Sequence, residues 1–101
     1  MAVLAVTYKI RPESAPEVER GIAKMMVAID REQPEGLRYA MGRLPDGLTF
    51  LGVLALDEGV DNPLPEIPAA REYQQNLTHW VAGEPPTPRP LRIVGSYRLF
   101  T

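Results

Sequence analysis

His79 is the side chain of this sequence best suited to move a proton. It is the only histidine among 101 residues, and histidine is the residue whose ordinary pKa lies near neutrality. Asn76 stands about one helical turn before it and Trp80 directly after it, so an amide and a large aromatic ring would share its helix. The plainer alternatives are a half-exposed surface histidine and a tryptophan packed in the core. If this helix carries chemistry, we expect that chemistry to pass through His79.

Three tyrosines, Tyr8, Tyr39 and Tyr97, are predicted to lie on strands and to face the helices. A buried tyrosine hydroxyl must find a hydrogen-bond partner. A polar-lined cavity would provide partners for all three hydroxyls, and bonds to the backbone are the alternative. Strand alternation places Phe50 and Leu54 on the same face, where they would line a pocket around the aromatic ring of a ligand.

Nucleophilic and metal-based chemistry find little support in the sequence. The chain has no cysteine and one histidine, and its serines are Ser14 and Ser96, so no serine or cysteine triad can be assembled. The same counts leave too few nitrogen and sulfur ligands for a zinc site. The acidic loop from Asp57 to Asn62 does not match a calcium-binding loop and is interpreted as solvated. We therefore expect no metal.

Length and composition indicate the class of protein. A length of 101 residues is that of one domain, which we place over residues 1–101. A formal net charge of −2, with acids and bases interleaved, offers no basic surface for nucleic acid. No run approaches the about 20 apolar residues of a membrane span, and residues 1–10 alternate like a strand rather than resembling a secretory leader. With no cysteine in the chain, the expected location is the cytoplasm.

Hydrophobic periodicity predicts four strands and two helices. Apolar residues recur at every second position in the strands and at spacings of three and four in the helices. A capping box from Ser14 to Glu17 begins the first helix, and Gly83 is placed to end the second. The Pro45-Asp46-Gly47 turn joins two strands as a hairpin, which sets Tyr39 opposite Leu54. The predicted strands are residues 2–10, 37–44, 48–56 and 91–100, and the predicted helices run from Ser14 to the stop at 34–36 and from Pro65 or Pro68 to about Ala82.

The order β-α-β-β-α-β predicts an α+β, ferredoxin-like domain. Two right-handed β-α-β units joined by the hairpin form an antiparallel sheet with both helices on one face. Strands 2–10 and 48–56 take the centre of this sheet, and strands 37–44 and 91–100 take its edges. The apolar sequence of 48–56 and the arginines of the two edge strands agree with this order.

Both faces of the predicted sheet are apolar, although the helices cover only one of them. A soluble monomer rarely exposes an apolar patch of more than a few hundred Å², so we expect a second copy to cover the other face, sheet against sheet. The helix-facing residues are bulky: Leu4, Val6, Tyr8, Ile10, Tyr39, Met41, Phe50, Leu54, Leu56, Ile93, Tyr97 and Leu99. The other face is built from Val3, Ala5, Thr7, Ala40, Gly42, Leu51, Val53, Ala55, Val94 and Ser96.

These features resemble the dimeric α+β barrel superfamily, and within it the antibiotic biosynthesis monooxygenase-like group. The resemblance covers nearly the whole chain and rests on element order, length, the Leu44-Pro45-Asp46-Gly47 hairpin and the terminal strand from Leu91 to Phe100. It implies a homodimer with a cavity between helices and sheet in each subunit. Many monooxygenase-like members carry a histidine in the second helix, as here at His79, and a tryptophan after the third strand, where this chain has Leu56-Asp57-Glu58.

The resemblance implies two kinds of function. The first is a cofactor-independent monooxygenase acting on a small aromatic or quinol-type substrate, which itself reduces O₂, so that the site has only to deprotonate it and exclude water. An alternative is an oxygenase that uses haem as its cofactor, with His79 as axial ligand. The second is a non-enzymatic dimer that binds a small ligand or responds to stress. In the cofactor-free enzyme His79 would be the base, Asn76 with Tyr97 or Tyr8 would bind the substrate oxygens, and Trp80, Tyr8, Tyr39, Phe50 and Leu54 would line the substrate pocket.

Overall fold

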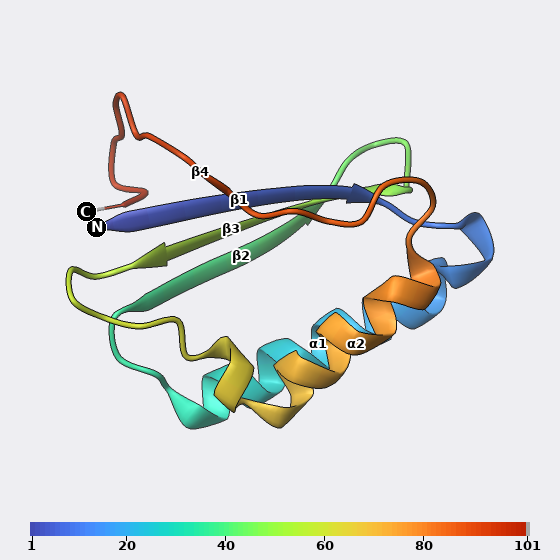
Figure 1. The fold of residues 1–101 in the computed structure, drawn as a ribbon, viewed down its shortest axis with the longest axis horizontal. Coiled ribbons are helices and arrows are strands. Elements are labelled where there is room, and N and C mark those ends of the chain that lie inside the picture. The colour runs from blue at the N-terminus through green and yellow to red at the C-terminus, as the bar shows by residue number, and fades with distance from the viewer. Residues whose placement is uncertain (101) are drawn as a thin grey trace.

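The structure, a computed structural model that describes residues 1–100, consists of a sheet and two helices that lie on one of its faces (Figure 1). The strands are antiparallel in the order β2-β3-β1-β4, so β1 and β3 take the centre as predicted. The α+β, ferredoxin-like fold is therefore confirmed. The elements are β1 (Ala2–Lys9), α1 (Ala15–Glu32), β2 (Leu37–Arg43), β3 (Thr49–Leu56), α2 (Pro68–Trp80) and β4 (Arg89–Pro90), with 3-10 turns η1 (Pro12–Ser14) and η2 (Leu64–Glu66).

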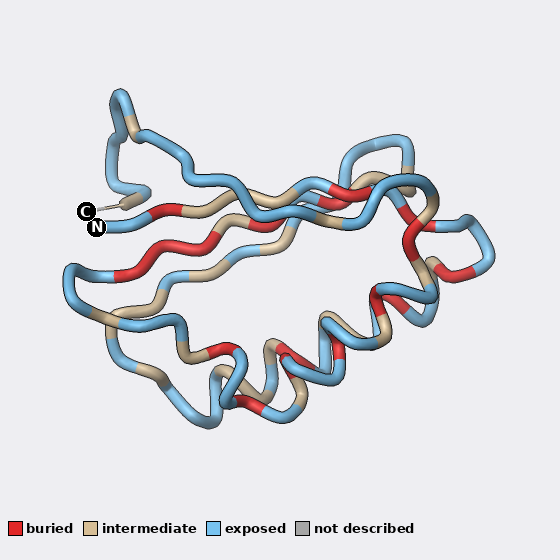
Figure 2. The backbone as a smooth tube through the Cα atoms, viewed as in Figure 1, coloured by how far each residue is buried: buried red, intermediate tan, exposed pale blue. Residues whose placement is uncertain are grey.

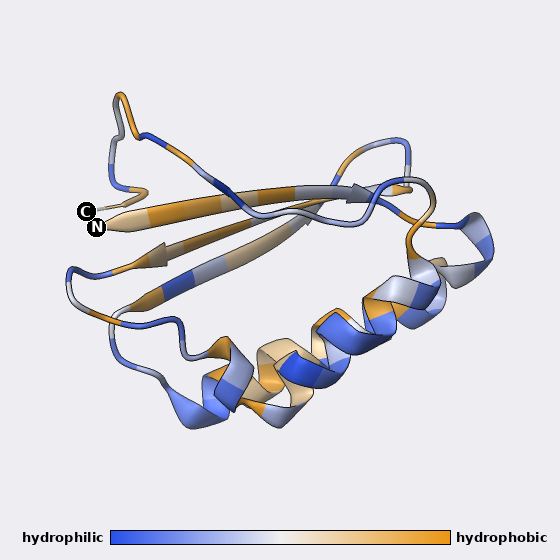
Figure 3. Cartoon of the chain, in the orientation of Figure 1, coloured by the Kyte–Doolittle hydropathy of each residue, from blue (hydrophilic) through white to orange (hydrophobic). Residues whose placement is uncertain are grey.

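The core lies between the helices and the sheet. Ile10, which directly follows β1, and Val18 and Met25 of α1 are fully buried. Tyr73 and Leu77 of α2 close the same core from the second helix. Figure 2 shows buried positions recurring along both helices and along the central strands, and Figure 3 shows hydrophobic residues concentrated in β1 and β3. The apolar side of each helix therefore packs against the sheet, as the spacing of its apolar residues predicts.

The predicted capping box at the start of α1 is wrong. Ser14 has a helical backbone, with φ −91° and ψ −7°, and its side chain makes no capping hydrogen bond. Turn η1 runs directly into the helix, and the Ala15 N–H donates to the Pro12 carbonyl, so the turn satisfies an amide that a cap would otherwise bind. Glu17 instead accepts a hydrogen bond from Trp80 Nε1 at 3.0 Å. The carboxylate therefore joins the two helices rather than capping one.

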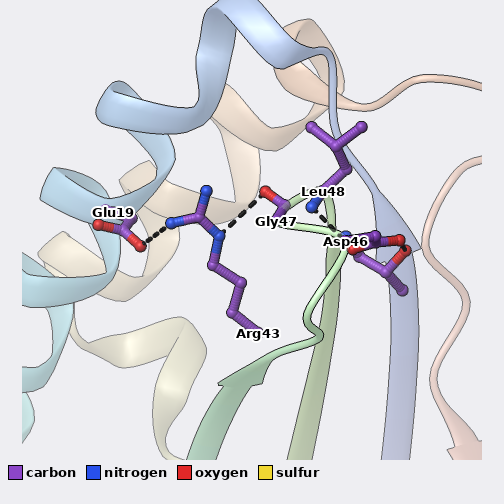
Figure 4. A network of polar contacts seen from close by, with 6 residues as sticks. Glu19, Arg43, Asp46, Gly47 and Leu48 are labelled. Atoms are coloured by element: carbon purple, nitrogen blue, oxygen red, sulfur yellow. Dashed lines mark hydrogen bonds and ion pairs between the residues drawn. The ribbon is translucent and has the colours of Figure 1, made fainter.

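The hairpin between β2 and β3 has the predicted register, with Tyr39 opposite Leu54. The Gly47 N–H donates to the Leu44 carbonyl at 2.9 Å, and Gly47 takes a φ of +74°, which glycine adopts without strain. The Asp46 carboxylate accepts the Leu48 N–H at 2.8 Å (Figure 4). Hydrogen bonds from the Thr49 hydroxyl and from nearby backbone amides lower the pKa of Asp46 to about 2.

Arg43 connects this hairpin to the first helix (Figure 4). Its Nε donates to the Gly47 carbonyl at 2.9 Å, and its Nη1 pairs with Glu19 of α1. The guanidinium also lies over the Phe50 ring, 5.7 Å from the centroid. The arginine at this sheet edge thus fixes α1 against β2.

The predicted strand at 91–100 is wrong, because β1 is too short to pair with it. Pro90 lies opposite Leu4, so residue 92 would lie opposite Ala2, the first residue of β1, and the residues beyond it find no strand alongside. Leu91 donates a last hydrogen bond to the Val3 carbonyl at 2.8 Å, after which the chain leaves the sheet. We call residues 91–100 the C-terminal arm. Figure 1 shows the arm rising from the side of the sheet away from the helices.

That side of the sheet, which we call the open face, carries no helix. Thr7 and Leu51 are exposed on it, and Val53 is half-buried. Val3 and Ala55 point the same way but are buried, at the end where the arm leaves the sheet. The open face is therefore partly covered at one end and bare toward its centre.

Candidate functional site

A small divided cavity lies between α2 and the helix-facing side of the sheet. Its two parts measure about 90 Å³ and about 40 Å³. Both parts are lined by Val6, Tyr39, Gln74 and Pro88, so they are neighbouring chambers of one site. An apolar cavity of about 150 Å³ is known to hold benzene, so this space is on the scale of one aromatic ring. The remaining lining residues are Leu4, Ala5, Gly52, Leu54, Asn62 and Leu64 in the larger chamber and Tyr8, Met41, Tyr73, Leu77 and Pro86 in the smaller.

Three tyrosines bring their hydroxyl groups to this cavity. The Tyr8 and Tyr73 hydroxyl oxygens are 2.5 Å apart and share a hydrogen bond, although they come from β1 and α2. The Tyr39 hydroxyl donates to Met41 Sδ at 3.3 Å, which is a weak acceptor. In the Tyr8–Tyr73 pair one hydroxyl donates and the other keeps its own proton. The cavity therefore has a hydroxyl proton free to donate to a ligand.

Burial raises the pKa of these tyrosines further above neutrality. It raises the pKa of Tyr39 to about 12, with a further contribution from the charge of Tyr73. It also raises the pKa of Tyr8, where Tyr73 and Tyr39 act in the same direction. The pKa of Tyr73 is likewise raised by burial, against an opposing effect of its hydrogen bond with Tyr8. At neutral pH the three hydroxyls are neutral donors rather than bases.

Backbone features create the room that the cavity needs. Gly52 lies in the middle of β3, and a Cβ added there would come within 2.8 Å of Met41 Sδ and 3.1 Å of Val6 Cγ1. A glycine inside a strand often marks such a close approach. Pro86 and Pro88, in the connector between α2 and β4, form another part of the cavity wall. A proline-rich segment of this kind is extended and stiff.

Some of the residues predicted for the site lie in this cavity. Tyr8, Tyr39 and Leu54 line it. Phe50 lies beside it rather than in it: its ring stacks on Tyr8 with centroids 6.0 Å apart, and its outer side faces a separate hollow between α1 and β2. The structure therefore brings the predicted pocket residues of the strands together, three in the cavity wall and Phe50 next to it.

The predicted residues of α2 lie elsewhere. The Trp80 ring packs over α1, where a Cβ on Gly21 would come within 3.2 Å of it. Asn76 stands one turn before Trp80 and one turn after Glu72, which pairs with Lys24 of α1 at 3.1 Å, so spacing puts Asn76 on the side of α2 that faces α1. His79 is exposed and lines neither chamber.

Tyr97 lies on the C-terminal arm with 82% of its surface exposed. Its predicted position beneath the helices is wrong because the arm leaves the sheet before reaching it. The predicted base His79, the amide Asn76 and Tyr97 are thus not brought together with Tyr8 and Tyr39. Their catalytic roles stay predictions.

Several lining residues were not assigned to the site from the sequence. The spacing of Tyr73 places it in the apolar stripe of α2, although its hydroxyl needs a partner just as that of Tyr8 does. Gly52 interrupts an otherwise apolar strand, which is a readable signal of close packing. Gln74 looks like a solvent-facing residue, and no feature of the sequence indicates that it lies at the cavity.

Two further observations limit the chemistry of the described residues. Within residues 1–100 no three His, Cys, Asp or Glu side chains lie close enough together to hold a metal ion. In the same part of the chain neither helix is long and apolar enough to cross a membrane.

Solved structures of low sequence identity share this fold. A Nitrosomonas europaea protein, provisionally described as an antibiotic biosynthesis monooxygenase, is similar with a TM-score of 0.73 and 14% identity, over 99% of this chain and 93% of that one. A Deinococcus radiodurans protein with the same provisional description is similar with a TM-score of 0.70 and 14% identity over 100% of both chains. The chain has the antibiotic biosynthesis monooxygenase-like fold.

A second Nitrosomonas europaea protein, of unknown function, is similar with a TM-score of 0.72 and 15% identity over 95% of this chain and 91% of that one. No protein-family model matches the chain, and no curated protein matches it. At these identities the likeness is one of fold, and one fold hosts many functions. The function therefore has to be argued from the cavity.

Proposed function

We propose that the chain binds a single-ring phenol or quinol in the tyrosine-lined cavity and acts on it as a cofactor-independent monooxygenase. The observation that supports this most is the convergence of three protonated tyrosine hydroxyls on a ring-sized apolar space. Apolar walls with a few placed polar groups are typical of small-molecule sites. The antibiotic biosynthesis monooxygenase-like fold is consistent with this reaction class without selecting it.

The proposed reaction needs only the substrate and O₂. One oxygen atom enters a ring carbon that carries hydrogen, and the other leaves as water, while the ring gives up four electrons and becomes a quinone. Phenol, C₆H₆O, with O₂ then balances benzoquinone, C₆H₄O₂, with water. The task left to the protein is to orient the ring, exclude bulk water and stabilise the negative charge that develops on the phenolic oxygen.

The tyrosines are suited to that task. The free hydroxyl proton of the Tyr8–Tyr73 pair can donate to a phenolic oxygen. Because the pKa of Tyr39 is raised to about 12, a bound phenol with an ordinary pKa near 10 is the stronger acid. Negative charge would therefore form on the substrate and not on the tyrosine, with the phenolic proton passing to solvent water beside the exposed Gln74. The hydroxyls would stabilise this charge as donors.

A second candidate function is the binding of a neutral ring without turnover. The lining of the two chambers, as far as residues 1–100 describe it, holds no histidine or carboxylate. Such a wall offers no base to remove the phenolic proton, which favours a ligand-binding protein. The two functions share the site and differ in whether oxygen is consumed.

Oxygen uptake with hydroquinone and substituted phenols separates these functions. We expect the wild type to consume O₂ and the Tyr8→Phe/Tyr73→Phe double variant to lose about 100- to 1000-fold in turnover, because it lacks the donors. Replacing both partners leaves no unsatisfied hydroxyl, so the fold should be kept. Tyr97→Phe, on the exposed arm, is the matched control and should retain full turnover.

His79→Ala completes the test because it addresses the base predicted from the sequence. If turnover follows His79 and not the tyrosine pair, the proposed site is refuted. If phenols bind with a saturable affinity that the double variant loses, while no oxygen is consumed, the binding function holds in place of the oxygenase.

A further inference from the structure

A second hollow lies beside the tyrosine-lined cavity, between α1 and β2. It measures about 250 Å³. Its apolar lining includes Ile22 and Ala23 of α1 and Met41 and Phe50 of the sheet. An apolar cavity of about 150 Å³ is known to hold benzene, so the hollow has room for an aromatic ring of its own.

Met41 separates this hollow from the cavity. Among residues 1–100 it alone lines both the smaller chamber of the cavity and the hollow, whereas every other lining residue belongs either to the cavity or to the hollow. The rings of Tyr8 in the chamber and Phe50 in the hollow stack with their planes 11° apart, so the aromatic walls of the two spaces adjoin. Met41 therefore stands between two neighbouring apolar spaces.

The Met41 side chain is held in this position from two sides. The Tyr39 hydroxyl donates a hydrogen bond to its Sδ at 3.3 Å. Met41 lies opposite Gly52 in the β2–β3 pairing, and a Cβ added to Gly52 would come within 2.8 Å of the same sulfur, so the thioether packs closely over the bare backbone of β3. An unbranched methionine is suited to fill an irregular gap of this kind. The side chain therefore forms a wall that β2 and β3 both support.

We propose that Met41 determines which ligands fit, because its side chain closes the cavity against the hollow and limits the site to a single aromatic ring. This role rests on the binding of a phenolic ring proposed above. Without the wall, the two chambers and the hollow would join into a space of more than about 300 Å³, twice the volume that holds one benzene ring. A phenol of two fused rings would then keep its hydroxyl near the tyrosines and place its second ring beside Phe50.

Isothermal titration calorimetry with 2-naphthol, a phenol of two fused rings, tests this role of Met41. We expect Met41→Ala to bind 2-naphthol at least about tenfold more tightly than the wild type, since even one methylene group that finds room in an apolar pocket changes affinity by this much. Met41→Leu keeps the volume of the side chain and should show no gain. Met26→Ala is the matched control and should also show no gain, because Met26 is a half-buried methionine of α1 that lines neither space.

A variant that fills the hollow distinguishes access to that space from a general loosening of the fold. Ala23 lines the hollow but not the cavity. We therefore expect the Met41→Ala/Ala23→Leu double variant to lose the gain in 2-naphthol affinity. Circular dichroism checks that each variant is folded. If Met41→Ala does not fold, the smaller truncation Met41→Val, which suits a strand, takes its place in both measurements.

Three results would each overturn the role of Met41: a wild type that binds 2-naphthol as tightly as the truncated variant, a folded truncated variant that gains no affinity, or a gain that survives Ala23→Leu. Phenol, titrated into the wild type in parallel, reports separately on the proposed function. If the wild type binds no phenol, that function fails, whereas a gain of 2-naphthol binding on truncation still supports Met41 as the wall between the two spaces.

Discussion

The helix-covered face and the open face of the sheet are built from the same three strands, but they hold different chemistry. On the covered side Tyr8 and Tyr39 bring hydroxyls against Tyr73 of α2, next to the space left by Gly52. On the open side the same strands present Thr7, Leu51 and Val53 and no buried hydroxyl. Alternation along a strand separates the two sets completely, because neighbouring residues point to opposite faces.

The two faces differ in how far a single chain buries their apolar side chains. On the covered side the apolar side chains are buried by the helices of the same chain, as Leu54 is at 7% exposure, so that face is complete within one chain. The open face, with Leu51 40% exposed and Val94 of the arm 91% exposed, is not. A ligand site is therefore expected on the first face and a macromolecular contact on the second.

The largest expected difference between the two faces lies in the stability cost of truncating two leucines of β3. Leu54 is 7% exposed on the covered face, and Leu51 is 40% exposed on the open face. We expect Leu54→Ala to lower the free energy of unfolding by about 2–5 kcal/mol and Leu51→Ala by about 1 kcal/mol or less. Urea denaturation at 1 µM, where any dimer is diluted, measures both. Equal losses would show that the two faces do not differ in packing.

The Tyr8–Tyr73 hydrogen bond gives the next largest effect. Tyr8→Phe leaves the Tyr73 hydroxyl buried with no recorded partner, and such a loss costs about 1–3 kcal/mol. Tyr73→Phe should cost a similar amount, while the double variant should cost less than the two single losses added together, since no orphan hydroxyl remains. Tyr97→Phe should change the free energy of unfolding by less than about 0.5 kcal/mol. Strict additivity in the double-variant cycle would contradict a bond between the two hydroxyls.

The pH dependence of stability tests the burial of the tyrosines. The unfolded chain releases the Tyr39 proton near the ordinary value of 10, whereas the folded chain holds it to about 12. Between these values the folded state binds more protons than the unfolded state. The contribution of the tyrosine to the free energy of unfolding is therefore fully present below pH 10 and is lost as the pH rises. The loss is up to about 1.4 kcal/mol per pH unit for each such tyrosine.

Free energies of unfolding at pH 9, 10 and 11 check this decline. Tyr39→Phe should make it shallower. A wild type and a Tyr39→Phe variant with the same slope above pH 10 would mean that Tyr39 titrates in the folded state as it does in water.

The fold could be predicted from the sequence because its signals are local. The alternation in 2–10 and 48–56, the Asp46-Gly47 turn and the stripes of the helices each specify one element, and the predicted bounds of the first three strands agree with the structure to within one residue. The last strand could not be placed, because its apolar alternation is real but the register leaves β1 too short to receive it. The sequence of one strand does not show whether another strand lies alongside it, because that depends on the register and length of the whole sheet.

The candidate site could be predicted only on its strand side. Strand alternation assigns Tyr8, Tyr39 and Leu54 to one face without ambiguity. On α2, however, residues a few positions apart can face either the sheet or α1, and the periodicity alone does not tell which. The sequence therefore points to His79, which is exposed, and gives no sign that the Tyr73 hydroxyl meets that of Tyr8.

The most direct test of the cavity as a ligand site is a titration with phenol followed by ¹H–¹⁵N NMR. The largest saturable shifts should fall on the amides of Tyr39, Gly52 and Gln74, which belong to three elements and meet only around this space. Shifts centred on His79 or on the C-terminal arm, or no saturable shift at millimolar phenol, would contradict the assignment.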